Sequence, residues 1–213
     1  MTVHLRLVAG VAEVVIDRPE KRNAMNQAMW IALRDHLHAI ESSDVRAIVL
    51  RGTGGSFCAG ADLSDRIADD PDHVDRFVAL AEHTVHALTN LDRPTVALID
   101  GPCIGAGLSL AMACDLRIAT PGSLFAIPSL RNGIVYERSL VERLVQIAGH
   151  GSAALLLLGG RRVDGAEANT RGLVDLCTPD AAAVVDDITE HLLSARPDGV
   201  AHIVDSIRSA ASA

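Results

Sequence analysis

The sequence has 213 residues, of which 49% are hydrophobic and only 2% are aromatic, and its formal net charge is −8 at pH 7. This length is typical of one domain with a sizeable buried core, and that core must be aliphatic and rich in alanine. Scarce aromatic side chains argue against binding of single-stranded nucleic acid, and the negative charge argues against a duplex-binding surface.

The first half of the chain alternates between strands and helices, which predicts an α/β fold with right-handed crossovers. Two β-rich runs around Ala9-Gly10 predict a hairpin, and later apolar patterns predict helices and short buried strands. The expected elements are strands at 3–8 and 11–17, a helix at 26–43, a strand at 46–51, a charged loop with a short helix at 64–75, a helix ending near 89, a strand at 95–100 and a helix at 108–114.

The second half continues the same alternation. Gly149 is expected to end a helix, and Asp164 followed by Glu167 resembles a helix start. The expected elements are strands at 116–119 and 123–127, a loop at 130–137, helices at 139–148 and 153–158, a strand at 173–177, and helices at 181–194 and 200–209. We expect a core domain at 1–195 and a short C-terminal helical tail at 196–213.

The cysteines are scattered and show no spacing typical of metal ligands. They are interpreted as small core residues of a protein from a reducing compartment: Cys58, Cys103, Cys114 and Cys177. The N-terminus lacks the apolar segment of a signal peptide, and no run is long enough to span a bilayer. We therefore expect a cytoplasmic protein without a membrane span, without a metal and without nucleic acid as a partner.

Two glycine-rich turns, at 57–63 and 101–107, each follow a buried strand. A strand that turns through glycines into a helix exposes unpaired backbone N–H groups, which can hold an anion or a developing oxyanion. The alternative is that these glycines serve backbone geometry alone. Adjacent strands of one sheet would place the two turns side by side, where two N–H groups could converge on one carbonyl oxygen.

Together with Asp17-Arg-Pro-Glu-Lys-Arg-Asn-Ala-Met-Asn26, these turns resemble the crotonase superfamily, the enoyl-CoA hydratase/isomerase family. The resemblance covers about 11–177 and includes the later segment 165–174. It implies a crotonase-like ββα spiral with flanking helices, with the C-terminal helical region shortened. It also implies an acyl-CoA thioester substrate in fatty acid metabolism, no cofactor beyond the coenzyme A of the substrate, and a homotrimer or a dimer of trimers.

The resemblance also assigns site residues. It places the oxyanion hole at the backbone N–H groups of Ala61 and Ala106. It places coenzyme A against Arg18, Lys21, Asn23, Ala24, Ala59, Asp62 and Leu63. Arg18, Lys21 and Arg22 would supply local positive charge for phosphates on an acidic protein, although each could instead be a solvated loop residue.

The sequence departs from the family where hydratases carry two glutamates, because Ser109 and Ser129 stand at those positions. A serine without a nearby base is a poor general base. Glu137 lies where some isomerases and a dehalogenase of the superfamily carry an acidic residue, so it is the candidate catalytic base. It could instead be a loop residue paired to Arg138, and Tyr136 could donate a hydrogen bond or simply pack.

We therefore expect an enzyme that stabilises a thioester enolate, an isomerase or lyase rather than a standard two-glutamate hydratase. The alternative is a non-catalytic acyl-CoA binding protein of the same fold, which the two serines favour. His83 and His86 are interpreted as surface residues of one helix, because no cysteine or carboxylate partners form a metal signature around them.

Overall fold

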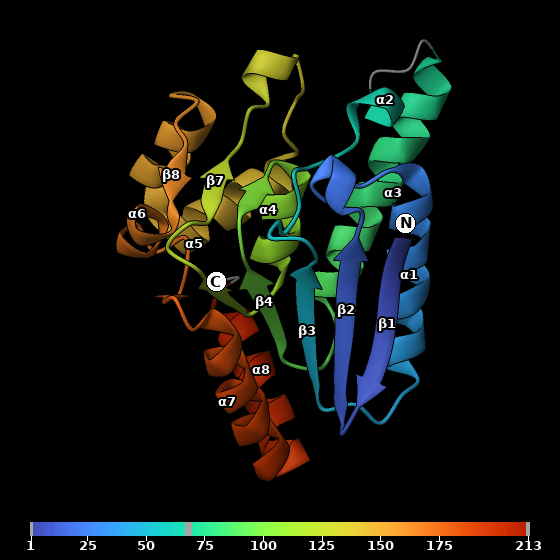
Figure 1. The fold of residues 1–213 in the computed structure, drawn as a ribbon, viewed down its shortest axis with the longest axis vertical. Coiled ribbons are helices and arrows are strands. Elements are labelled where there is room, and N and C mark those ends of the chain that lie inside the picture. The colour runs from blue at the N-terminus through green and yellow to red at the C-terminus, as the bar shows by residue number, and fades with distance from the viewer. Residues whose placement is uncertain (1, 67–69, 212–213) are drawn as a thin grey trace.

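A computed structural model of the chain describes residues 2–66 and 70–211 (Figure 1). It contains two sheets, and the larger one includes the N-terminal hairpin. Its strands, in spatial order, are β1 (Thr2–Val8), β2 (Val11–Asp17), β3 (Ala47–Gly52), β4 (Thr95–Ile99), β6 (Leu116–Ala119) and β9 (Leu176–Cys177). β1 is antiparallel to β2, and the other neighbours are parallel. Parallel pairs need crossovers, which the helices between them supply.

The smaller sheet consists of β5 (Pro102–Ile104), β7 (Leu124–Ala126) and β8 (Val163–Asp164). Two single bridges, Met25 with Ala61 and Cys58 with Cys103, extend this layer toward the N-terminus. Successive turns of the chain thus leave one strand in the large sheet and one short segment in the second layer. This is the crotonase-like ββα spiral expected from the sequence.

Among the helices, α1 packs on β1 and β2, and α7 packs on β3, β4 and β6 from the opposite face of the large sheet. The α-helices of the described residues are α1 (Gln27–Glu41), α2 (Leu63–Arg66), α3 (Pro71–Thr89), α4 (Ala106–Ala113), α5 (Arg138–Leu157), α6 (Gly165–Thr170), α7 (Ala181–Ser194) and α8 (Pro197–Ala211). Alternate residues of a strand face opposite sides. Ile48 and Leu50 of β3 therefore join the main core with α1, while Val49 packs against Val185 of α7.

Helix α4 is the centre of the main core. Each of its residues from Gly107 to Ala113 is buried, so the helix is apolar on all sides, as expected for a fully enclosed helix. Gly105 precedes it with φ 52° and ψ −115°, a conformation that suits glycine. The second glycine-rich turn is therefore fixed to the most buried helix of the protein.

The predicted strand at 173–177 is wrong in extent. Leu173 and Val174 are buried but lie outside a strand, and only β9 (Leu176–Cys177) pairs with the sheet. Strands β5 and β8 were not expected, because two or three residues carry no periodicity. Gly149 does interrupt the helical geometry, with φ 77°, although α5 continues beyond it. Part of the charged loop expected at 64–75, residues 67–69, lies outside the described residues.

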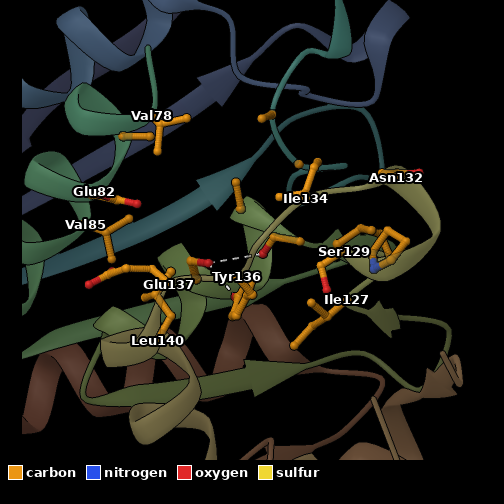
Figure 2. A pocket seen from close by; sticks show the side chains of 18 of the residues that line it. Val78, Glu82, Val85, Ile127, Ser129, Asn132, Ile134, Tyr136, Glu137 and Leu140 are labelled. Atoms are coloured by element: carbon orange, nitrogen blue, oxygen red, sulfur yellow. Dashed lines mark hydrogen bonds between the residues drawn. The ribbon is translucent and has the colours of Figure 1, made fainter. Parts of the chain in front are cut away.

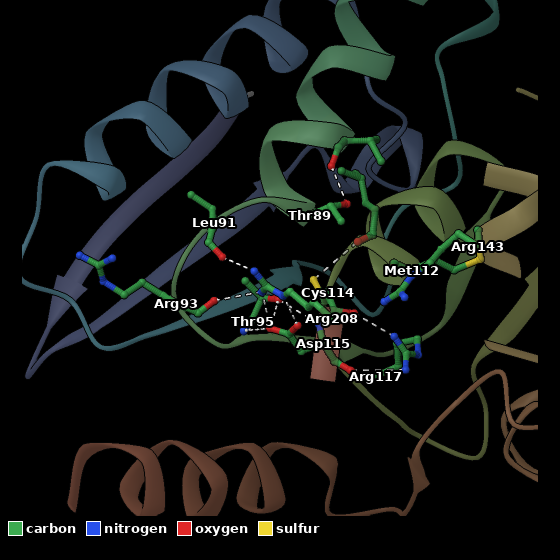
Figure 3. Close-up of polar contacts among 12 residues, drawn as sticks. Thr89, Leu91, Arg93, Thr95, Met112, Cys114, Asp115, Arg117, Arg143 and Arg208 are labelled. Carbon is green, nitrogen blue, oxygen red and sulfur yellow. Dashed lines mark hydrogen bonds and ion pairs between the residues drawn. The ribbon is translucent and has the colours of Figure 1, made fainter. Parts of the chain in front are cut away.

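Helix α8 is held to the body of the fold by Arg208 (Figure 3). The guanidinium bonds to both carboxylate oxygens of Asp115, at 2.8 and 2.7 Å, and to the carbonyls of Leu91 and Arg93. Asp115 also accepts hydrogen bonds from the N–H and the hydroxyl of Thr95. The tail expected at 196–213 thus begins where α7 ends and is tied back near its own end. In the described part of the chain, no helix is both long and apolar enough to cross a membrane.

Replacing Arg208 with methionine should lower the free energy of unfolding by about 1–3 kcal/mol, because Asp115 would lose its cation at a mostly buried position. Urea denaturation measures this loss. Arg196→Ala is the control, since Arg196 is 86% exposed and pairs with Asp198 at the surface; it should change stability by less than about 0.5 kcal/mol. Equal effects of the two variants would contradict a stabilising role for Arg208.

Candidate active site

The two glycine-rich turns lie side by side and are joined by backbone hydrogen bonds. The Cys58 N–H donates to the carbonyl of Pro102, and the Ile104 N–H donates to the carbonyl of Cys58, both at 2.9 Å. A Cβ at Gly107 would lie 2.2 Å from the Cys58 carbonyl oxygen, so only glycine fits there. The two turns are therefore held at the contact distance of two backbones.

Ala61 and Ala106 occupy adjacent points of these turns, since a Cβ at Gly60 would lie 3.8 Å from the Ala106 nitrogen. Within the described residues, neither the Ala61 N–H nor the Ala106 N–H makes a hydrogen bond. Both residues line one cavity of about 200 Å³. Two unpaired N–H donors in one cavity wall can bind a carbonyl oxygen that gains negative charge.

The cavity is mainly apolar, with a few polar side chains in its lining. Figure 2 shows Val78, Glu82 and Val85 on one side and Ile127 and Ser129 on the other, with Tyr136 between them. Apolar walls with few polar groups are typical of a small-molecule site.

The Ser109 hydroxyl is bonded to the Tyr136 hydroxyl at 2.6 Å. Burial raises the pKa of Tyr136 well above its ordinary value, so the phenol stays neutral and can donate a proton in a hydrogen bond. Ser109 also lies 3.3 Å from the carbonyl of Gly105. Tyr136 thus both packs and bonds, and no carboxylate contacts the Ser109 hydroxyl among the described residues.

Glu137 lines the same cavity and directly precedes α5, but its side chain does not cap that helix. Its Oε2 is buried and has no hydrogen-bond partner in the described residues, while Nε2 of His86 lies 3.9 Å away. The alternative pairing with Arg138 is wrong, because Arg138 bonds to Glu142 at 2.7 Å. The carboxylate is therefore available to the cavity. Its proximity to His86 had no signal in the sequence, since 51 positions separate the two.

Several residues expected to bind coenzyme A bond to one another instead of facing the cavity. Arg18 donates to Asp62 at 2.6 Å and to the carbonyl of Ala24 at 3.1 Å. Partial burial opposes ionisation of Asp62, but the hydrogen bonds from Arg18 and Ser64, together with the charge of Arg18, outweigh it and lower the pKa of that carboxyl. Asn23 is fully buried and bonds to the backbone at Arg18, Thr53 and Ser56. These side chains shape the loop.

The other expected residues divide between the cavity and the surface. Ala59 and Leu63 line the cavity, and Leu63 is 48% exposed. Lys21 and Arg22 are exposed on the neighbouring loop, so their positive charges are accessible to solvent. Within the described residues, no cluster of histidine, cysteine and carboxylate side chains could hold a metal ion.

All four cysteines are free, and Cys58, Cys103 and Cys114 are buried as expected. Burial raises the pKa of Cys58 and of Cys114 to about 12. Cys177 is only partly buried, and a smaller desolvation raises its pKa.

Iodoacetamide at pH 8 should therefore modify only Cys177 in the folded protein, because a pKa of about 12 leaves roughly one thiol in ten thousand ionised. Intact-mass spectrometry should show one adduct on the native chain and four after denaturation. The rate at Cys177 should still be rising at pH 9, since its pKa is raised. Rapid native modification of Cys58 would contradict this prediction.

Known proteins resemble this chain in both sequence and fold. The sequence profile described as enoyl-CoA hydratase/isomerase matches residues 6–213. YngF of Bacillus subtilis, named for the same group, is 38% identical over 170 residues, which cover 79% of this chain and 65% of YngF. The human mitochondrial enoyl-CoA hydratase domain-containing protein 2 is 34% identical over 168 residues, covering 78% of this chain and 58% of that protein. The chain thus spans less than two thirds of either relative.

The crystal structure of an enoyl-CoA hydratase from Bacillus anthracis is similar with a TM-score of 0.92 at 27% identity, over 97% of this chain and 82% of that one. Sequence and fold therefore agree over nearly the whole chain. The chain belongs to the enoyl-CoA hydratase/isomerase family of the crotonase superfamily.

Proposed function

We propose that the protein is an isomerase that acts on an acyl-CoA thioester by stabilising its enolate. The main support is that the backbone N–H groups of Ala61 and Ala106 make no hydrogen bond within the described residues and lie in the wall of one apolar cavity. Two such donors would bind the thioester oxygen more strongly as it becomes an enolate oxygen. Proton removal from the α-carbon would then need only one base.

In this proposal Glu137 is that base. Its buried, unbonded Oε2 in the cavity supports the assignment, because a base must reach the proton that it removes. The same carboxyl would return the proton at a second carbon and so move the double bond. The neutral Tyr136 hydroxyl, bonded to Ser109, would donate a hydrogen bond without adding charge.

Coenzyme A would lie outside the cavity mouth in this proposal. Ala59 and Leu63 line the cavity, and exposed Lys21 and Arg22 would meet the phosphates. Arg18, Asn23, Ala24 and Asp62 would hold the loop in shape. The homotrimer and the cytoplasmic location remain predictions from the sequence.

A non-catalytic acyl-CoA binding protein is the second candidate. Two observations favour it. The Ser109 hydroxyl is already hydrogen-bonded to Tyr136, and Ser129 places a hydroxyl in the cavity lining where hydratases carry a carboxylate. Hydration by two carboxylates is therefore not expected of this site.

Proton exchange separates the two candidates. The protein is incubated in D₂O with butyryl-CoA, and deuterium at the α-carbon is followed by mass spectrometry, beside an assay that converts 3-enoyl-CoA to 2-enoyl-CoA. We expect both exchange and isomerisation. Tight acyl-CoA binding with neither reaction would support the non-catalytic candidate, and absence of binding would reject both.

A further inference from the structure

A second cavity, of about 250 Å³, adjoins the proposed acyl site between α3, α4 and α5. The two cavities share Val85, Ser109 and Leu140 as lining residues. Val85 and Leu140 are aliphatic, so the shared wall presents no charge to an acyl chain. An acyl chain that enters by the oxyanion turns therefore has a continuation in this direction.

The far side of the second cavity carries two unused hydrogen-bond donors, Arg143 and Ser139. They are four residues apart on α5 and so lie on one face of the helix. Nε of the half-buried Arg143 donates to the carbonyl of Met112 at 3.2 Å, and among the described residues no other hydrogen bond or ion pair engages this guanidinium. The Ser139 hydroxyl oxygen is buried and has no partner in the described residues.

The acidic groups around this cavity are already paired with other arginines. Asp115 is bonded by Arg208, and Glu142 is bonded by Arg138 (Figure 3 shows the Asp115 cluster). Asp175, which adjoins the cluster, pairs with Arg117 at 2.7 Å. The other titratable side chain in the lining is His86, which is exposed.

Arg143 is thus the one arginine of this group that has no carboxylate partner among the described residues. Burial, followed by the proximity of Arg117 and Arg208, lowers the pKa of its guanidinium, although Asp115 and Asp175 oppose this. A guanidinium with free Nη donors matches the two oxygens of a carboxylate, and the Ser139 hydroxyl adds a third donor.

We propose that Arg143 and Ser139 bind a carboxylate at the far end of the acyl chain, so that the protein selects acyl-CoA thioesters of dicarboxylic acids. This inference rests on the proposed function, because the other end of the same chain must lie at Ala61 and Ala106. It names the substrate class of that site: thioesters whose chain ends in a carboxylate rather than a methyl group.

Calorimetric titration with matched thioesters tests the proposal. The pairs differ only at the chain end: succinyl- with butyryl-CoA, glutaryl- with valeryl-CoA, adipoyl- with hexanoyl-CoA, and suberyl- with octanoyl-CoA. For the pair of fitting length, the carboxylate member should bind about 10- to 100-fold more tightly, as expected for a bond between a charged donor and a charged acceptor. Arg143→Gln should reduce this ratio to about one, and Ser139→Ala should reduce it less.

Arg196→Gln is the matched control, because Arg196 has an 86% exposed side chain and pairs with Asp198 away from both cavities; it should retain the ratio. The proposal is overturned if the methyl-ended member binds at least as tightly in every pair, or if Arg143→Gln keeps the preference. Free adipate that binds and needs Arg143, without any preference among the thioesters, would mean a separate anion site and also overturns it. If no thioester of either kind binds, the proposed function itself fails.

Discussion

Glu137→Gln should lower the rate of double-bond isomerisation by about 10²- to 10⁴-fold, the usual contribution of a positioned general base. Glutamine keeps the size and planarity of the side chain but cannot accept a proton at the α-carbon. Glu137 makes no hydrogen bond through its buried Oε2, so the substitution removes at that atom only the ion-pair contact with Nε2 of the half-exposed His86, 3.9 Å away. The effect should therefore appear in kcat, while the Kd for butyryl-CoA stays nearly unchanged.

Glu190→Gln is the control for this prediction. Glu190 is exposed on α7 and lines neither cavity, so the same charge is removed away from the proposed acyl site. Steady-state kinetics and α-proton exchange should be close to those of the unmodified protein. Unchanged turnover in Glu137→Gln would remove Glu137 from the mechanism, even if the control behaves as expected.

Gly107→Ala should lower the free energy of unfolding by about 3 kcal/mol and abolish measurable turnover. The new Cβ would lie 2.2 Å from the Cys58 carbonyl oxygen and 3.0 Å from the Cys58 carbonyl carbon. Both contacts are with buried backbone, which cannot rotate away as a side chain can. The two turns must separate, and the N–H groups of Ala61 and Ala106 would no longer converge.

Gly122→Ala is the matched control, since a Cβ there meets nothing within 4 Å and Gly122 has no positive φ. Its free energy of unfolding should change by less than about 0.5 kcal/mol. Urea denaturation and the rate of 3-enoyl-CoA isomerisation are measured for both variants. A Gly107→Ala protein that keeps its stability and its turnover would show that close contact of the turns is unnecessary.

The parts of the fold that the sequence predicts are those with local signals. The β-rich runs, the amphipathic helices and the glycine turns are each written in adjacent residues, and β1, β2, α1, α4 and α7 appear close to the expected positions. Strand β8 has two residues and β5 has three, so each exists only through its partner in the sheet. No window of the sequence contains that information.

The candidate site shows the same division. The positions of Ala61, Ala106 and Glu137 follow from motifs, and all three line one cavity. The bonds between Arg18 and Asp62 and between Ser109 and Tyr136 join residues far apart in the chain. Such pairs depend on how the elements pack. The sequence of a charged loop does not reveal whether its arginine binds a phosphate or pairs with an aspartate elsewhere in the chain.

The backbone contact between the two turns has a consequence for how this protein could change over time. Ala61 and Ala106 each lie three residues beyond a member of the parallel bridge between Cys58 and Cys103, and paired backbones lie about 4.8 Å apart whatever their side chains. The separation of the two N–H donors therefore depends on backbone pairing. In the proposed function the carbonyl would be bound without any particular side chain, so substitutions at 109, 129 and 137 would exchange one reaction for another without rebuilding the two turns.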